Sequence, residues 1–146
     1  ILFVFPQFTL ISRLLEGEFL NYDAIIPREF RIETIVDTKT FIASIERASL
    51  IVSGEFTKTP LRVQVAENEI TLNCSAQMGK ATDSFSAQVT GGDLEIGFNF
   101  KYLLDALNAV DEPETKVLFN MSLNPCIIRP LEGDDYLYMI LPIRLA

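Results

Sequence analysis

Residues 37–45 read DTKTFIASI, and 62 positions later residues 99–107 read NFKYLLDAL. In each stretch a residue type that commonly caps helices, Asp37 or Asn99, precedes apolar residues spaced three or four positions apart. Lys39 and Lys101 occupy the same place in the two stretches. The pattern predicts two amphipathic helices that begin at equivalent positions of an internal repeat. The alternative is a chance agreement between two unrelated amphipathic helices.

Strand patterns surround both predicted helices. Polar and apolar residues alternate over 31–36 before the first helix, and a second β-rich run, 94–98, precedes the other helix. Three strands are predicted after each helix, at 61–65, 70–74 and 81–89 in the first half and at 116–120, 126–129 and 136–143 in the second. Each half is then a βαβββ unit. Two such units predict an α+β domain with two helices side by side, two antiparallel sheets, and strands that can pair between the halves.

Residues 1–27 precede this repeat. Two apolar, β-rich runs, 1–5 and 8–15, are separated by Pro6-Gln7, which predicts a hairpin, and an irregular segment is expected over 16–27. The chain begins with Ile1 and has no basic region before its first apolar run, which argues against a signal peptide. We therefore expect it to be a piece of a longer protein.

The composition is that of a folded, acidic chain. Its 146 residues, 49% of them apolar, are enough for one domain with a sizeable core. Twelve Lys and Arg against 20 Asp and Glu give a net charge of −8, which argues against a generally basic nucleic-acid-binding protein but leaves room for a small basic face. The apolar runs are far shorter than the roughly 20 residues that span a membrane, so no membrane association is expected.

The sequence offers little catalytic chemistry. The chain has no His, which removes Ser–His and Cys–His nucleophile pairs and imidazole metal ligands. Cys74 and Cys126 are best interpreted as buried cytosolic thiols, with a disulfide as the alternative. The acidic runs 111–114 and 132–135 lack a calcium-loop pattern and are expected to be solvated turns. We therefore predict no catalytic residue, metal ligand or cofactor, and keep an acidic metal-dependent hydrolase as an alternative.

The chain end is apolar from Tyr136 almost to the last residue. Terminal segments are usually polar and frayed. Either this end is a buried strand with a short extension, or its apolar side chains form a docking surface.

Four motifs follow one another along nearly the whole chain. They are LISRLLEGEF at 10–19 running into Asn21-Tyr22 and Ile26-Pro27, LEIGFN at 94–99 with KYLLDAL at 101–107, IIRP at 127–130 before DYLY at 135–138, and LPIRL at 141–145. In this order they resemble the C-terminal part of the bacterial DNA polymerase III beta subunit, the sliding clamp. The last motif is similar to the Met-Pro-Met-Arg-Leu ending of that family.

The resemblance implies a DNA-clamp fold, in which each subunit has three similar domains and two subunits form a ring around duplex DNA. Residues 1–25 would be the last hairpin of the preceding domain plus a connector, and residues 26–146 the C-terminal, third domain. It also implies a cytoplasmic, non-catalytic processivity factor that tethers DNA polymerase, the clamp loader and repair proteins through short peptide motifs. A purely structural oligomerisation module is the remaining alternative.

The resemblance further assigns residues to three surfaces. The partner-peptide cleft would comprise Leu20, Ile25, Leu123, Pro125, Cys126, Met139, Leu141, Pro142, Ile143 and Arg144. The DNA-facing residues would be Lys39, Arg47 and Lys101, with ordinary solvated helix charges as the alternative, and the subunit contact would involve Leu50 and Ile51. Leu20 stands where the family often has Pro, and Leu141 and Ile143 replace methionines. Branched side chains adapt less well than Met, so we expect the cleft to accept fewer peptides.

Overall fold

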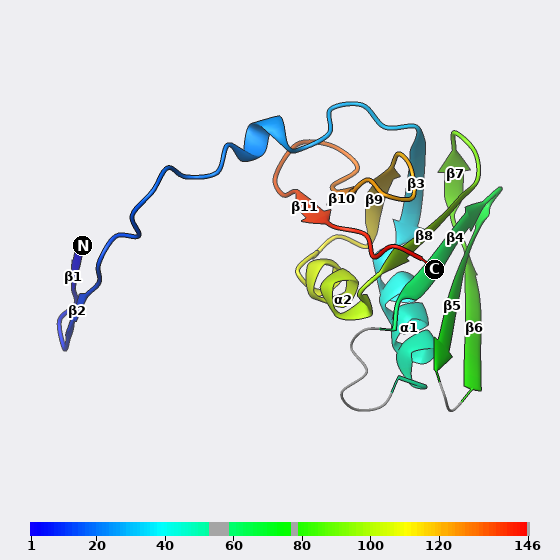
Figure 1. Ribbon diagram of the computed structural model, residues 1–146, viewed down its shortest axis with the longest axis horizontal. Helices are drawn as coiled ribbons and strands as arrows, with labels where there is room; N and C mark the ends of the chain where they lie inside the picture. The colour runs from blue at the N-terminus through cyan, green and yellow to red at the C-terminus, as the bar shows by residue number, and fades with distance from the viewer. Residues whose placement is uncertain (53–58, 77–78, 146) are drawn as a thin grey trace.

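Figure 1 shows the computed structural model of the chain, which describes residues 1–52, 59–76 and 79–145. Two α-helices lie in these ranges, α1 (Thr38–Ser49) and α2 (Phe100–Asn108). The strands of the folded domain are β3 (Ile32–Asp37), β4 (Leu61–Ala66), β5 (Glu69–Ala76), β6 (Gly79–Ser86), β7 (Gln88–Thr90), β8 (Leu94–Phe98), β9 (Glu114–Phe119), β10 (Cys126–Arg129) and β11 (Tyr138–Ile140). The α+β class predicted from the repeat is confirmed.

Both helices begin where the capping residues predicted. The Thr40 N–H donates to Asp37 Oδ1 at 2.7 Å, and the Lys101 N–H donates to Asn99 Oδ1 at 3.0 Å. These bonds satisfy N–H groups that have no partner inside the first turn of a helix. The apolar face of each helix then turns inward, with Phe41, Ile45 and Ala48 buried in α1 and Leu103, Ala106 and Leu107 buried in α2.

The two halves exchange their first strands. One sheet has the order β11-β10-β9-β3-β7 and the other the order β6-β5-β4-β8. β3 of the first half pairs with β9 of the second, and β8 of the second half pairs with β4 of the first. The prediction that strands pair between the halves is therefore confirmed, and the exchange makes each half depend on the other for a complete sheet.

The predicted third strand, 81–89, is in fact two strands in different sheets. β6 ends at Ser86 in the four-stranded sheet, and β7 begins at Gln88 in the five-stranded sheet. Ala87 lies between them, buried, and its N–H donates to the Asn68 carbonyl at 3.1 Å. The last strand is likewise shorter than predicted, covering only Tyr138–Ile140. Apolar periodicity continued through both boundaries, so it did not reveal where pairing changes.

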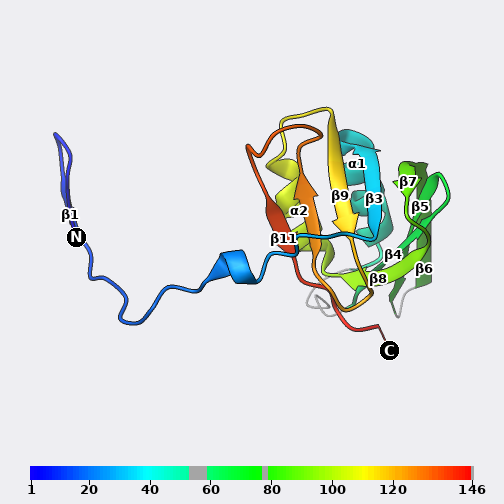
Figure 2. The same ribbon diagram turned by 90° about the horizontal axis from the view of Figure 1, so that it is seen from above.

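The core lies between the helices and the sheets. α1 packs against β3, β5, β6 and α2, and α2 also contacts β11 (Figures 1 and 2). Phe41, Phe98 and Phe119 are among the largest fully buried side chains. Cys74 and Cys126 are buried free thiols, as predicted, and no disulfide joins them.

The N-terminal segment stands away from this domain (Figures 1 and 2). Strands β1 (Leu2–Val4) and β2 (Thr9–Ile11) form the predicted hairpin, and the short 3-10 helix η1 (Tyr22–Ala24) interrupts the irregular segment that follows. Most large apolar side chains of this segment are exposed to solvent. In the described ranges, no helix has the length and apolar character that crossing a membrane requires.

Candidate functional site

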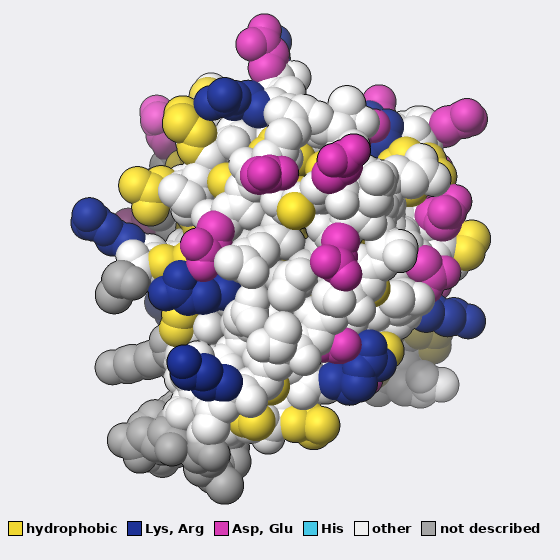
Figure 3. Space-filling view, turned by 90° about the vertical axis from the view of Figure 1, so that its right-hand side faces the viewer, with side chains coloured by type: hydrophobic (Ala, Val, Ile, Leu, Met, Phe, Trp, Pro, Cys, Tyr) yellow, Lys and Arg dark blue, Asp and Glu magenta, His cyan; other side chains and the backbone are white. Residues whose placement is uncertain are grey.

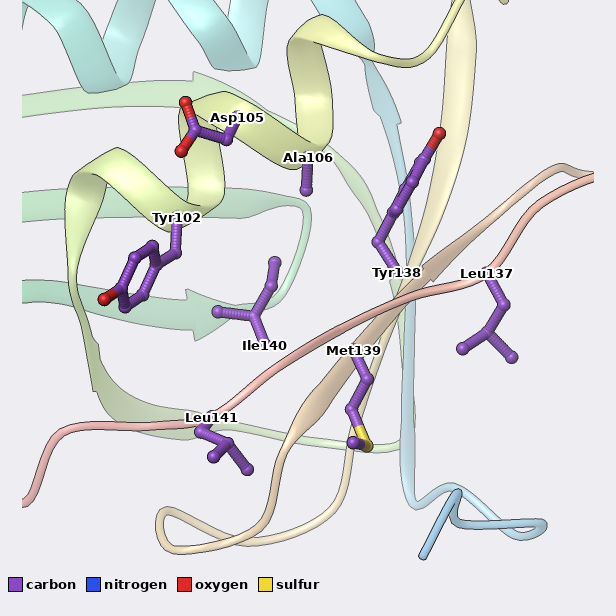
Figure 4. A pocket seen from close by; sticks show the side chains of 8 residues that line it. All are labelled: Tyr102, Asp105, Ala106, Leu137, Tyr138, Met139, Ile140 and Leu141. Carbon is purple, nitrogen blue, oxygen red and sulfur yellow. The ribbon is translucent and has the colours of Figure 1, made fainter. Parts of the chain in front are cut away.

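A largely apolar groove runs along α2 and β11 (Figure 4). Its volume is about 540 Å³. It is lined by Tyr102, Asp105, Ala106, Leu137, Tyr138, Met139, Ile140 and Leu141. We refer to these eight residues as the α2–β11 groove.

The helix side of the groove follows from the spacing of residues in α2. Positions three and four apart lie on one face of a helix, so Tyr102, Asp105 and Ala106 share a face. Leu103 and Leu107 are buried, as is Ala106, so Ala106 lies where the face along the groove meets the buried face of the helix. Tyr102 belongs to the predicted amphipathic helix, and it is 60% exposed. The buried residues of α2 are Leu103, Ala106 and Leu107. Tyr102 lies to one side of them on the helix, and this spacing could have identified it as a surface residue.

The strand side follows from the alternation of side chains along β11. Tyr138 and Ile140 point toward α2, whereas Leu137, Met139 and Leu141 point to the other side of the strand (Figure 4). β11 pairs with β10 and is the last strand of its sheet. The edge of a sheet therefore borders the groove, and edge strands offer backbone groups to an incoming extended chain.

Two tyrosines fix the strand in place. The Tyr138 hydroxyl donates to the carbonyl of Ala109, just after α2, at 3.2 Å, and its ring stacks on Tyr136 with centroids 5.3 Å apart. The Tyr136 and Thr115 hydroxyls share a hydrogen bond of 3.1 Å. Partial burial raises the pKa of the Tyr136 hydroxyl, so it stays neutral. The polar groups left at the groove are mainly the Tyr102 hydroxyl and the Asp105 carboxylate.

The chain end continues from β11 to the other sheet. After Ile140, Leu141 is 65% exposed, and the Ile143 N–H then donates to the Gly97 carbonyl of β8 at 2.7 Å. The end of the chain is therefore neither an unbroken buried strand nor a free tail. It pairs with β10 at Ile140 and with β8 at Ile143, and the side chain of Leu141 between these two residues is exposed to solvent.

The predicted cleft residues fall in different environments. Met139 and Leu141 line the groove, Pro142 and Ile143 follow as half-buried residues, and Arg144 is exposed. Leu20 and Ile25 are exposed in the N-terminal segment and do not line the groove. Leu123 is exposed and Pro125 half-buried before β10. Cys126 is fully buried, and burial raises the pKa of its thiol to about 12, so this side chain belongs to the core.

Of the predicted DNA-facing residues, Arg47 differs from the other two. Lys39 and Lys101 are exposed near the starts of α1 and α2, which contact each other. Arg47 forms an ion pair of 2.7 Å with Asp83 of β6. Desolvation alone would raise the pKa of Asp83, but hydrogen bonds from Ser44 and Arg47 bring it below its ordinary value. The charge of Arg47 is thus balanced within the domain.

The remaining predicted surface lies at the end of α1. Leu50 is 79% exposed, whereas Ile51 is half-buried against the core. On the side of the molecule formed by β5, β6 and β7, acidic and basic side chains are interspersed (Figure 3). Within the described ranges, no group of three or more Cys, Asp or Glu residues is placed to hold a metal ion.

The comparisons with known proteins agree on one family. A family model described as the DNA polymerase III beta subunit, C-terminal domain, matches residues 23–144. The beta sliding clamp of Bacillus subtilis is 35% identical over 99% of this chain and 39% of the relative, and that of Synechococcus elongatus is 31% identical over 93% and 36%. The chain therefore spans little more than a third of the curated relatives it matches.

Solved structures give the same result. The DNA polymerase III beta subunit of Thermotoga maritima superposes with a TM-score of 0.85 at 32% identity, covering 92% of this chain and 36% of that one. A sliding clamp from Bartonella birtlesii, solved bound to griselimycin, superposes with a TM-score of 0.84 at 28% identity, covering 94% and 36%.

Proposed function

Since the chain belongs to the DNA polymerase III beta subunit family, the bacterial sliding clamps, we propose that it is the partner-binding part of a clamp. In this proposal the full-length protein forms a homodimeric ring around duplex DNA in the cytoplasm. The ring tethers DNA polymerase, the clamp loader and repair proteins through short peptides, and it catalyses no reaction itself. Residues 26–146 are the third clamp domain, and residues 1–25 are the last hairpin of the second domain plus the connector.

The α2–β11 groove is the observation that supports this function best. Its volume of about 540 Å³ is within the usual range for ligand sites, and its walls are mainly apolar. An extended peptide could insert apolar side chains beside Leu141 and Met139 while its backbone approaches the edge of β11. Tyr102 supplies a rigid aromatic anchor of the kind that often dominates binding energy.

The two neighbouring helices support the DNA part of the proposal. Lys39 and Lys101 would face the duplex, and Arg47, which is paired with Asp83, would add little charge. A clamp needs only weak, sequence-independent attraction to phosphates, so an acidic body with a few inward cations is compatible with sliding. Leu50, with Ile51 behind it, would contribute to the contact between subunits.

The alternatives have no observation in their favour. A metal-dependent hydrolase needs clustered carboxylates, and the described residues offer none placed for a metal ion. A purely structural module would have no use for a peptide groove, so a binding measurement separates it from a clamp.

Griselimycin, which the Bartonella birtlesii structure contains, is the probe for this measurement. We expect the full-length protein to bind it by isothermal titration calorimetry. Leu141→Ala or Tyr102→Ala should weaken binding by about 1–4 kcal/mol, as for truncated anchors at other interfaces. Met121→Ala, which removes an exposed apolar side chain outside the groove, should have no effect. Absence of binding, or equal binding by Leu141→Ala and Met121→Ala, would contradict the proposed function.

A further inference from the structure

A glycine occupies the second-last position of β8, although the backbone there does not require one. Gly97 pairs with Arg62 of β4 and is buried. Its φ lies outside the left-handed region, so a residue with a side chain could adopt the same backbone conformation. Glycine in the interior of a strand lowers stability and often marks a close approach by another part of the chain.

The close approach is made by the chain end. A Cβ atom at position 97 would lie 2.5 Å from Leu145 Cδ2 and 2.7 Å from the Ile143 carbonyl oxygen. The second of these contacts is with backbone, which cannot be relieved by rotating a side chain. At the same place the Ile143 N–H donates to the Gly97 carbonyl at 2.7 Å.

This contact connects the two sheets. β8 is the last strand of the four-stranded sheet, and β11 is the last strand of the five-stranded sheet. Ile140 pairs with Cys126 in β10, and Ile143 pairs with Gly97 in β8. Leu141 and Pro142 are the two residues that bridge the gap, and Pro142 restricts the backbone further.

We propose that Gly97 and the Ile143 amide form a backbone latch, and that Gly97 is thereby a positioning residue for the α2–β11 groove. The latch holds the chain end across the edge of β8, and so it fixes Leu141 from its C-terminal side. This inference rests on the proposed function, because it is the peptide-binding role of the groove that the latch would serve.

The latch matters because Leu141 has little else to hold it. Its side chain is 65% exposed, and a chain end that follows the last paired residue usually frays. Without the bond to Gly97, the residues after Ile140 would sample many conformations. A ligand would then have to order them on binding, which lowers affinity without removing any contact.

Two changes to the full-length protein test the latch. Gly97→Ala places a methyl group against the Ile143 carbonyl. An amide-to-ester replacement at Ile143, made by semisynthesis, removes the N–H donor and keeps every side chain, although it also weakens the Pro142 carbonyl as an acceptor. The matched control is the same ester at Leu145, whose N–H has no hydrogen-bond partner among the described residues.

We expect the Ile143 amide to be protected from hydrogen exchange in the unmodified protein and to exchange at least about tenfold faster in Gly97→Ala. Griselimycin affinity should fall about 3- to 10-fold in Gly97→Ala and in the Ile143 ester, and stay unchanged in the Leu145 ester. The thermal melt should change little, because β8 keeps its pairing with β4.

The outcomes separate the two proposals. If the unmodified protein does not bind griselimycin, the proposed function fails, and the positioning role fails with it. If it binds but the Ile143 ester matches the Leu145 ester in affinity, the latch is overturned while the proposed function stands. An unprotected Ile143 amide in the unmodified protein also overturns the latch. If Gly97→Ala does not fold, the ester pair decides.

Discussion

At the scale of single residues, Asp83 joins α1 to β6. Its carboxylate accepts hydrogen bonds from Ser44 Oγ and Arg47 Nε, both at 2.8 Å. Ser44 is fully buried, so its hydroxyl depends on this partner. Because Arg47 is 55% exposed, solvent screens much of the attraction between the two charges.

We predict that Asp83→Asn lowers the free energy of unfolding by about 1 kcal/mol at pH 7. The pKa of Asp83 is lower in the folded protein than its ordinary value of 3.8, so its contribution is present above that pH and is lost as the pH falls further. The difference between variant and parent, measured by urea unfolding, should therefore shrink below about pH 4.

Asp93→Asn is the matched control, because Asp93 is an exposed carboxylate in the turn before β8. It should leave the unfolding free energy nearly unchanged. A difference between Asp83→Asn and the parent that stayed constant from pH 7 to pH 3 would argue against a charged Asp83 in this role.

Single contacts of this kind could not be predicted from the sequence. Arg47 and Asp83 are far apart along the chain, and only the packing of α1 on β6 brings them together. The resemblance placed Arg47 among the DNA-facing cations, with an ordinary solvated helix charge as the alternative. Cys126 was expected to be a buried thiol, while the resemblance also placed it beside a cleft, and the pairing of β10 between β9 and β11 buries it.

At the scale of elements, the two caps explain why the helices could be predicted so closely. A cap acts within one turn, so its effect depends on neighbouring residues alone. We predict that Asp37→Ala and Asn99→Ala each destabilise the protein by about 1 kcal/mol in urea unfolding. Asp37→Asn keeps an oxygen that can accept from Thr40, so it should lose less.

Glu46→Ala serves as the control for α1, because Glu46 is exposed in the second half of the helix. It should change stability by less than about 0.5 kcal/mol. Equal losses for Glu46→Ala and Asp37→Ala would mean that helix propensity, and not the cap, sets the effect.

Pairing between elements was harder to predict than the elements themselves. Alternation over 31–36 and 61–65 predicted strands, and the duplicated unit predicted exchange between halves. The change of sheet at Ala87 has no local signal, because the residues on both sides of it are equally compatible with a strand. The groove shares this limit, since its walls come from α2 and β11, which are distant in sequence and meet only through tertiary packing.

At the scale of the whole molecule, charge and topology determine how the proposed clamp would be held on DNA. The net charge of −8 opposes tight non-specific binding, and the exposed cations Lys39 and Lys101 share their helices with the exposed acids Glu46 and Asp105. The electrostatic attraction of this domain for a duplex is therefore small. In the proposed function, the protein stays on DNA because a closed ring encircles the duplex, and not because its charge attracts the phosphates.

We accordingly predict that this 146-residue chain alone is not retained on duplex DNA at physiological salt. Any binding at low salt should have a slope of log K against log salt no steeper than about −2, because two lysines neutralise at most two phosphates. Lys39→Ala combined with Lys101→Ala should remove that weak binding. Electrophoretic mobility shifts on a linear duplex over a series of salt concentrations provide the measurement.

The full-length protein loaded on a circular duplex provides the comparison. Its retention should survive high salt, because a closed ring cannot dissociate by losing ionic contacts, and cutting the circle should release it. The double lysine variant should be released at the same rate after cutting. Tight binding of the 146-residue chain to linear DNA that persists when Lys39, Arg47 and Lys101 are all changed to Ala would be incompatible with a clamp. It would require a DNA-binding surface other than the helices.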